Sequence, residues 1–189
     1  MIVGFTGYAR SGKSTAAEVL RTSAGFTLLA FADPIKDLLV RLDPPIWRST
    51  ALDAPRLSSL LGGTDLEALK SSNSVGYQIR RWLQDLGVEC RNVLGPDVWV
   101  DALAKRWESS GFPALVIPDV RFPNEFDWIH RNGGKIVRVL RPGTGPANDH
   151  ISETGTEYAW TDHIIVNDGS AEDLSAAVIR YATVQGLLR

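Results

Sequence analysis

Short apolar runs alternate along the chain with segments in which apolar residues recur every three or four positions. The runs predict buried strands at residues 2–6, 26–32, 114–118, 135–140 and 163–166. The periodic segments predict helices at residues 14–23, 34–42, 77–92, 97–108, 126–131 and 171–184. Strands that alternate with helices indicate a mostly parallel sheet with helices on both faces, which is a three-layer α/β/α fold. Ligands of such sheets bind beyond the carboxyl ends of the strands.

The stretch from residue 43 to residue 74 departs from this pattern. Prolines, paired glycines and a Ser/Asn cluster interrupt every period, so we expect a loop-rich insertion with one short helix. Before this stretch, Asp33 is expected to cap the helix that carries Pro34 in its first turn. After it, the apolar face of the helix at 77–92 is expected to place Trp82 and Leu83 in a core.

Composition and charge narrow the class of function. The chain has 189 residues, of which 44% are hydrophobic and 22% charged, values typical of one globular domain. The formal net charge of −2 argues against a general nucleic-acid-binding protein, which normally carries a basic excess. Cys90 is the only cysteine, which excludes an internal disulfide and favours a reducing compartment. No apolar run approaches the roughly 18 residues of a membrane span. We also expect no signal peptide, because Met1 leads directly into an apolar strand.

A glycine-rich segment joins the first predicted strand to the first predicted helix. Residues 7–14 read GYARSGKS and fit the pattern G-x-x-x-x-G-K-[ST], the P-loop of nucleotide-binding proteins. Glycines let the backbone curl around a phosphate chain, and a lysine reaches the β- and γ-phosphates beside the helix N-terminus. A glycine turn before an ordinary helix cap is the alternative, but the strand and the helix on either side favour the P-loop. The residues of this segment expected to contact ATP are Gly7, Arg10, Ser11, Gly12, Lys13, Ser14 and Thr15.

A second candidate for catalysis follows the apolar strand ALVIP. Asp119 ends this strand, where P-loop proteins often place an acid that binds Mg²⁺ together with the loop hydroxyl, here Ser14. Arg121 follows two residues later, and its planar guanidinium is suited to bridging the donor and acceptor phosphates. The alternatives are a turn residue at the strand end for Asp119 and a solvent-facing ion pair with Glu125 for Arg121. The expected catalytic residues are therefore Lys13, Asp119 and Arg121.

The size of the chain and the motifs that it lacks indicate a small-molecule kinase. Regulatory GTPases carry an N-K-x-D motif, and VNDG at residues 166–169 lacks the lysine. An ATPase motor would need a longer chain. A small-molecule kinase needs an arginine-rich acceptor pocket and a lid that excludes water from the phosphoryl group. A nucleotide-binding switch that acts through a partner protein is the alternative from a different class.

Five segments together carry a family resemblance: GYARSGKST, FADPIKDLL, RRWLQDLGVECRNVLGPDVWV, IPDVRFPNE and DHISE. In this combination the chain resembles the deoxynucleoside monophosphate (dNMP) kinases of tailed bacteriophages, through nearly its whole length and most weakly over residues 43–74. The resemblance implies transfer of the ATP γ-phosphoryl group to a dNMP, giving a dNDP and ADP. The animal phosphomevalonate kinases have a similar layout, so another small phosphorylated acceptor is the alternative. The resemblance does not say which bases are accepted.

The resemblance also implies which residues bind the acceptor. Asp33 and Lys36 would line the acceptor pocket after the second strand. Arg80 and Gln84 are four residues apart, so one helix face is able to hold a phosphate and a base edge. The alternative is a solvated helix face with an Arg81–Asp85 ion pair. The acceptor-binding residues implied are Asp33, Lys36, Arg80, Gln84, Asp85, Arg91, His150 and Glu153.

Residues 141–161 are polar and glycine-rich and resemble the lid of such kinases. Arg141 would lie over the ATP, and His150 and Glu153 would contact the lid or the substrate unless their roles are structural. A phosphate acceptor is ionised near neutral pH, so neither residue is needed as a general base. Asn167 follows the last strand, in the loop that lies beside adenine in related kinases. The alternative for Asn167 is a turn residue.

We therefore predict a single P-loop kinase domain over residues 1–189. Its core would comprise residues 1–42, 93–140 and 162–189, with an acceptor-binding insertion at about 43–92 and a lid at about 141–161. ATP and Mg²⁺ are the expected cofactors, and a dNMP is the expected small-molecule substrate. We expect neither a nucleic acid nor a membrane as a partner, and either a monomer or a homodimer. The expected location is the cytoplasm, that of the host cell if a phage encodes the chain.

Overall fold

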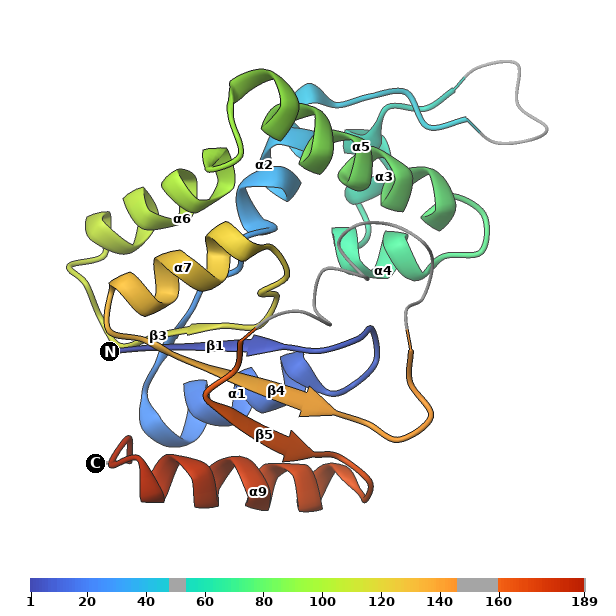
Figure 1. The fold of residues 1–189 in the computed structure, drawn as a ribbon. Coiled ribbons are helices and arrows are strands. Elements are labelled where there is room, and N and C mark those ends of the chain that lie inside the picture. Colours follow the sequence, from blue (N-terminus) through green and yellow to red (C-terminus); the bar gives the residue numbers. More distant parts are fainter. Residues whose placement is uncertain (48–53, 146–159, 189) are drawn as a thin grey trace. The chain divides into compact units, whose positions relative to one another are not determined.

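The computed structural model describes residues 1–47, 54–145 and 160–188 (Figure 1). The chain divides into two compact units, which are described separately. The first unit comprises Met1–Phe31 and Val100–Arg189, and the second comprises Ala32–Trp99. The predicted insertion at residues 43–92 falls within the second unit. The division into a core, an acceptor-binding insertion and a lid remains a prediction about function.

Parallel strands form the centre of the first unit. They are β1 (Ile2–Thr6), β2 (Thr27–Leu28), β3 (Leu115–Ile117), β4 (Lys135–Leu140) and β5 (His163–Val166). Their order in the sheet is β2-β3-β1-β4-β5, and every neighbouring pair is parallel. The central strand β1 places Gly4 beside Ile117 of β3 and Ile136 of β4. All five strands therefore end at one edge of the sheet.

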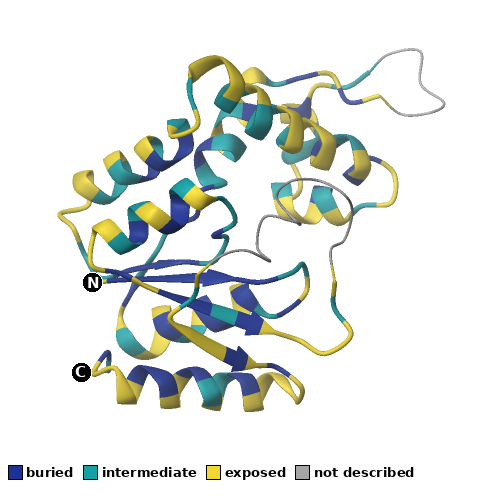
Figure 2. Ribbon diagram, viewed as in Figure 1, coloured by how far each residue is buried: buried dark blue, intermediate teal, exposed yellow. Residues whose placement is uncertain are grey.

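Helices cover both faces of this sheet (Figures 1 and 2). On one face, α1 (Lys13–Ala24) and α9 (Ala171–Val184) bury a core that includes Phe5, Leu20 and Val178. On the other face, α7 (Pro123–Arg131) and the first-unit part of α6 (Val98–Ser109) bury Leu103, Ile117 and Ile129. The first unit is thus a three-layer α/β/α P-loop fold with an all-parallel sheet. This arrangement confirms the predicted fold class.

The described part of the second unit is helical. It contains α2 (Asp33–Leu42), α3 (Leu57–Leu61), α4 (Leu66–Ser71) and α5 (Gly76–Leu94). These helices share a small core of their own, formed by Leu39, Ile46, Leu57, Leu69, Val75 and Ile79. In the described ranges of both units, the helices are too short or too polar for any of them to cross a bilayer.

Two element predictions were wrong in extent. The strand predicted at 26–32 contains only Thr27–Leu28, because β2 is an edge strand that pairs with β3 alone. Beyond it the chain leaves the sheet, and the Phe31 N–H donates to Asp119 at 2.9 Å. The helix predicted at 126–131 begins earlier, at Pro123, because the Glu125 carboxylate accepts the Phe122 N–H at its start.

Three further predictions were wrong in the second unit. The stretch 43–74 contains two short helices, α3 and α4, where one was expected. Asp33 is the first residue of α2 and not its cap, because Ala32 occupies the cap position. Trp82 is 39% exposed, while the neighbouring Leu83 packs against the core. The helical period alone cannot tell which of two adjacent apolar residues lies at the margin of a narrow buried face.

Candidate active site

The loop between β1 and α1 needs glycine at two positions. Gly7 has φ 135° and Gly12 has φ 107°, a region that residues with a side chain rarely adopt. A Cβ atom at Gly7 would lie 2.4 Å from the carbonyl oxygen of Val139, and one at Gly12 would lie 2.7 Å from Nδ2 of Asn167. The loop therefore lies directly against the carboxyl ends of β4 and β5. Only its two motif glycines allow that approach.

The first turn of α1 presents main-chain N–H groups and one ammonium group to this loop. Gly12 precedes the helix and has no side chain that could accept a hydrogen bond from those N–H groups. Lys13 is 8% exposed, and its Nζ donates to the carbonyl oxygens of Gly7 at 2.7 Å and Tyr8 at 2.6 Å. The partial positive charge of the helix terminus and the ammonium group together favour an anion at the loop.

Asn167 connects the loop after β5 to the P-loop. Its side chain is 5% exposed, and Nδ2 donates to the Ser11 carbonyl oxygen at 2.8 Å. Its own N–H donates to the carbonyl oxygen of Leu140 at 2.7 Å, at the end of β4. The expectation that Asn167 lies beside adenine remains a prediction. The observed contact shows a supporting role for the P-loop backbone.

Asp119 and Arg121 lie just beyond β3, in a turn held by main-chain hydrogen bonds. Asp119 accepts the Phe31 N–H, and both belong to the first unit. The Glu125 carboxylate is 1% exposed and accepts the N–H groups of Arg121 at 2.7 Å and Phe122 at 3.1 Å. Glu125 therefore fixes the backbone that carries Arg121 at the carboxyl edge of the sheet. Because β1 and β3 are adjacent, this is the edge at which the P-loop begins.

The remaining predicted ATP contacts of the first unit are exposed. Ser14 and Thr15 lie in the first turn of α1, and Arg10 adopts a left-handed φ of 64° at the top of the loop. Arg141 lies in the turn that follows β4. Among the described residues, no three His, Cys, Asp or Glu side chains form a metal-binding group. One hydroxyl and one carboxylate suit Mg²⁺, which keeps several waters and binds mainly phosphate oxygens in kinases.

In the second unit, Lys36 lies among carboxylates. Its Nζ is 3.0 Å from Glu67 and 3.7 Å from Asp33, and Glu67 also pairs with Lys70 at 2.8 Å. Partial burial would raise the pKa of Glu67, but hydrogen bonds from Lys70 and Lys36 outweigh it and hold that pKa below its ordinary value. The carboxylate thus stays ionised and keeps the Lys36 ammonium group in place at the start of the unit.

Two of the predicted residues of α5 contact the second unit's own backbone. Arg80 donates to the Lys70 carbonyl oxygen, and Arg91 donates to that of Pro96 at 2.8 Å. Arg81 and Asp85 form an exposed ion pair at 3.6 Å, which is the alternative that the sequence offered for this helix. Gln84 is exposed on the same helix. The acceptor-binding roles of Arg80, Gln84, Asp85 and Arg91 remain predictions.

Comparison with known proteins decides the family. The family model described as deoxynucleotide monophosphate kinase matches residues 54–178 of the 189-residue chain. This chain belongs to the deoxynucleotide monophosphate kinase family. The deoxynucleotide monophosphate kinase of Enterobacteria phage T4 is 25% identical over 94% of this chain and 96% of its own. That of Escherichia phage RB69 is 32% identical over 70% of this chain and 57% of its own. Dephospho-CoA kinase from Campylobacter jejuni aligns over 99% of this chain and 97% of its own, with 15% identity and a TM-score of 0.48.

Two of the residues predicted from the family resemblance lie outside the described part of the chain. They are His150 and Glu153, and most of the predicted lid at 141–161 lies there with them.

One charged residue at the carboxyl edge of the sheet, Arg138, is not among the site residues predicted from the sequence. Arg138 belongs to β4, and its guanidinium carbon lies 5.9 Å from the ring centroid of Tyr8, which is a residue of the P-loop. The sequence does single out Arg138. In the strand KIVRVL the residues after Lys135 are all apolar except this arginine. A charged side chain in the interior of a central strand is costly unless it has a partner or a ligand.

Proposed function

We propose that this chain transfers the γ-phosphoryl group of ATP to the 5′-phosphate of a deoxynucleoside monophosphate. The products are a deoxynucleoside diphosphate and ADP. The observation that carries the proposal is the P-loop, where the α1 terminus and the Lys13 ammonium group meet at a loop bounded by two obligatory glycines. Family membership supports the choice of acceptor.

In the proposed reaction, an ionised oxygen of the acceptor phosphate attacks the γ-phosphorus of ATP. The bond to the bridging oxygen between the β- and γ-phosphorus atoms breaks, and its electron pair leaves with ADP. No general base is required, because the attacking oxygen carries no proton near neutral pH. The transition state is loose and spreads negative charge over the equatorial oxygens, so the protein contributes alignment and positive charge.

The first unit would supply that charge. Lys13 and the N–H groups of α1 bind the β- and γ-phosphates, and Arg121 bridges the donor and the acceptor from the turn after β3. Mg²⁺, when bound, neutralises charge on the same phosphates, with Ser14 and Asp119 as the proposed protein ligands. The fixed turn around Glu125 holds Arg121 in place before the substrates arrive.

The second unit would supply the acceptor contacts. Lys36 is the proposed phosphate-binding cation, kept at the start of α2 by its pairs with Glu67 and Asp33. A phosphate that takes these hydrogen bonds would replace one anionic partner of Lys36 by another. Arg80, Gln84 and Arg91 are the further proposed contacts.

A coupled assay with Mg·ATP and each of dAMP, dGMP, dCMP and dTMP tests the proposal. We expect ADP release to depend on at least one of the four acceptors, with the corresponding diphosphate as product. Phosphomevalonate serves as the control acceptor and should give no product. Slow ATP hydrolysis that no acceptor accelerates would contradict the proposal and indicate a nucleotide-binding switch.

A further inference from the structure

Arg138 is a charged residue in the interior of a strand whose other interior residues are apolar. It is the fourth residue of β4, a strand that pairs with β1 on one side and β5 on the other. The neighbouring positions Val137 and Val139 are buried in the core beneath α1 and α9. Arg138 itself is only half-buried. Partial burial of a guanidinium group costs desolvation free energy that an apolar side chain would not cost. A ligand that binds the guanidinium would offset this cost.

The strand register shows which face of the sheet Arg138 occupies. Ile136 lies beside Gly4 and Arg138 lies beside Thr6, two residues further along both strands. A Cβ atom at Gly4 would point toward Ile129 of α7, so this set of positions belongs to the α7 face. Side chains two residues apart in a strand share a face. Arg138 therefore occupies the α7 face, two residues before the carboxyl end of β4.

Arg138 is held against the P-loop by an aromatic ring. Its guanidinium carbon is 5.9 Å from the ring centroid of Tyr8, the second residue of the loop. Such stacking orients the guanidinium plane and leaves its N–H groups available at the edge. Among the residues that the structure describes, no carboxylate lies within ion-pair distance of Arg138. Within the described ranges, the guanidinium is thus an oriented cation whose N–H groups are not taken up by a carboxylate, beside a phosphate-binding loop.

A second polar group accompanies Arg138 on this face. Thr6, its neighbour on β1, is fully buried, and its Oγ1 has no hydrogen-bond partner within the described ranges. A buried hydroxyl without a partner is uncommon and points to a group that the protein alone does not supply. Near their carboxyl ends, β1 and β4 therefore carry polar side chains, Thr6 and Arg138, on the α7 face of the sheet.

We propose that Arg138 is a further substrate-binding residue, which donates its guanidinium N–H groups to phosphate oxygens at the position of phosphoryl transfer. The inference rests on the proposed kinase activity. The ligand chemistry is a phosphate group with at least two accessible oxygens. Two sources have this chemistry, the γ-phosphoryl group of ATP and the phosphate of the acceptor, and a bidentate arginine recognises either one.

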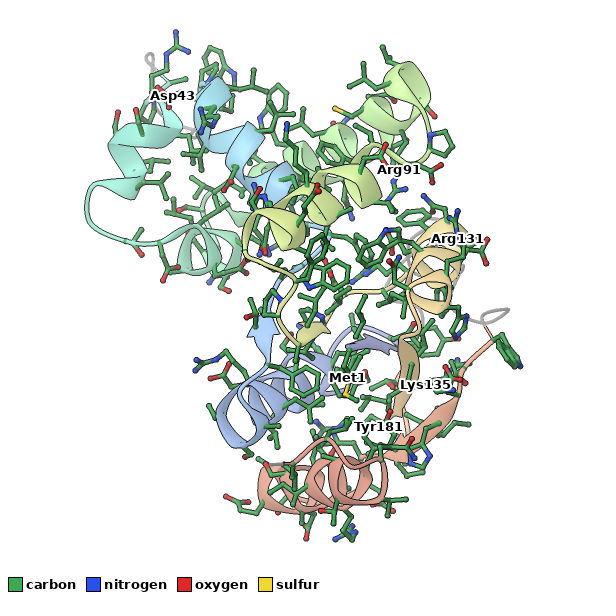
Figure 3. All side chains as sticks on the ribbon, turned by 90° about the vertical axis from the view of Figure 1, so that its left-hand side faces the viewer. Met1, Asp43, Arg91, Arg131, Lys135 and Tyr181 are labelled. Atoms are coloured by element: carbon green, nitrogen blue, oxygen red, sulfur yellow. The ribbon has the colours of Figure 1, made fainter. Side chains whose placement is uncertain are left out.

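The test compares the wild type with Arg138→Met, Arg138→Lys and a control, Arg131→Met. Arg131 is an exposed arginine at the end of α7, and Figure 3 labels it together with Lys135 at the two ends of the turn that leads into β4. That turn precedes the amino end of the strand, away from the P-loop. For each protein we would measure kcat, both KM values, ATP and ADP affinity by calorimetry, and the midpoint of thermal unfolding.

We expect Arg138→Met to lower kcat/KM by about 10²-fold or more, because two charge-assisted hydrogen bonds are lost. ADP affinity and the unfolding midpoint should stay at the wild-type values. Weaker binding of ATP but not of ADP would assign the contact to the γ-phosphoryl group, whereas a raised KM for the dNMP alone would assign it to the acceptor. Arg138→Lys should lose about tenfold, since the charge remains without the planar fork. Arg131→Met should match the wild type.

Several results would overturn the inference. One is a folded Arg138→Met or Arg138→Lys protein whose kinetic constants all stay within about threefold of wild type. Another is an equal loss of ATP and ADP affinity, which would show that Arg138 acts only on the loop through Tyr8. A lowered unfolding midpoint with unchanged kinetics would show a purely structural role. Failure of the proposed function itself is distinguishable, because the wild type would then show no acceptor-dependent transfer.

Discussion

The side-chain amide of Asn167 donates to the main-chain carbonyl oxygen of Ser11 at 2.8 Å, across a separation of 156 residues. The loop after the last strand thereby supports the loop after the first strand. The same amide nitrogen would lie 2.7 Å from a Cβ atom at position 12, so the contact leaves no room for a side chain at Gly12. The P-loop conformation therefore depends on a contact from the far end of the chain as well as on its own glycines.

Asn167→Ala should weaken Mg·ATP binding by about tenfold, because the loop loses a buried hydrogen bond that holds its backbone. The free energy of unfolding should fall by about 1 to 2 kcal/mol for the same reason. Calorimetry and chemical denaturation measure the two effects. Asn92→Ala, at an exposed position of α5, is the matched control and should change neither. Unaltered ATP affinity in Asn167→Ala would contradict a supporting role.

Lys13→Ala should abolish phosphoryl transfer while the fold is retained. The ammonium group donates to the loop's own carbonyl oxygens of Gly7 and Tyr8, and truncation to alanine removes neither the helix backbone of α1 nor the loop glycines. We expect a loss in kcat of about 10³-fold or more, since the lysine balances charge on the transferred group. Lys105→Ala, on the exposed face of α6, controls for the loss of a lysine. Near-normal turnover of a folded Lys13→Ala protein would exclude the proposed mechanism.

Arg121→Ala should lower kcat by about 10³-fold and raise the KM for ATP much less, because the proposed contact forms fully only in the transition state. Steady-state kinetics with varied ATP and saturating acceptor measure kcat and the KM for ATP separately. Arg131→Ala removes an exposed arginine from α7, the helix that follows Arg121, and should leave both constants unchanged. If only the KM for ATP moved, Arg121 would be an ordinary binding contact.

Glu125→Ala should destabilise the first unit by about 2 to 4 kcal/mol, since two partly buried N–H groups, those of Arg121 and Phe122, lose their shared acceptor. Glu125→Gln keeps one acceptor oxygen and should lose less than half as much. Urea denaturation measures both values. In the same proteins kcat should fall, because Arg121 is no longer held. Equal stability of Glu125→Ala and the wild type would show that the turn is supported elsewhere.

Asp162 makes the stability of the first unit depend on pH. Burial would raise its pKa, but the Ile136 N–H and the side chains of His130 and Lys135 outweigh it and hold the pKa of Asp162 below its ordinary value. The stabilisation is therefore complete above the unfolded-state pKa of about 3.9 and is lost as pH falls through the lower folded-state pKa. Asp162→Asn should reduce the fall in the free energy of unfolding with decreasing pH, measured between about pH 2 and 6. The same pH dependence of the free energy of unfolding in Asp162→Asn and the wild type would contradict this assignment.

Contiguous residues determined most of the fold and the centre of the site. The apolar runs at 135–140 and 163–166 became β4 and β5 with the predicted bounds, and the helix at 171–184 became α9. The P-loop was also readable, because glycine torsions, a helix start and a lysine at fixed spacing are local properties of the backbone. Alternation of the two element types was sufficient to predict a parallel sheet.

Tertiary structure alone decided the contacts that surround this centre. The Asn167–Ser11 bond, the Glu125 turn and the position of Arg138 beside Thr6 each depend on strand order and register. The same holds for the short β2 and the exposed Trp82, whose environments are set by an edge position and by the margin of a small core. A residue's own neighbours in the chain specify its torsions and its periodicity. They do not specify which distant backbone its side chain will meet, because that pairing arises only when the sheet and its helices pack together.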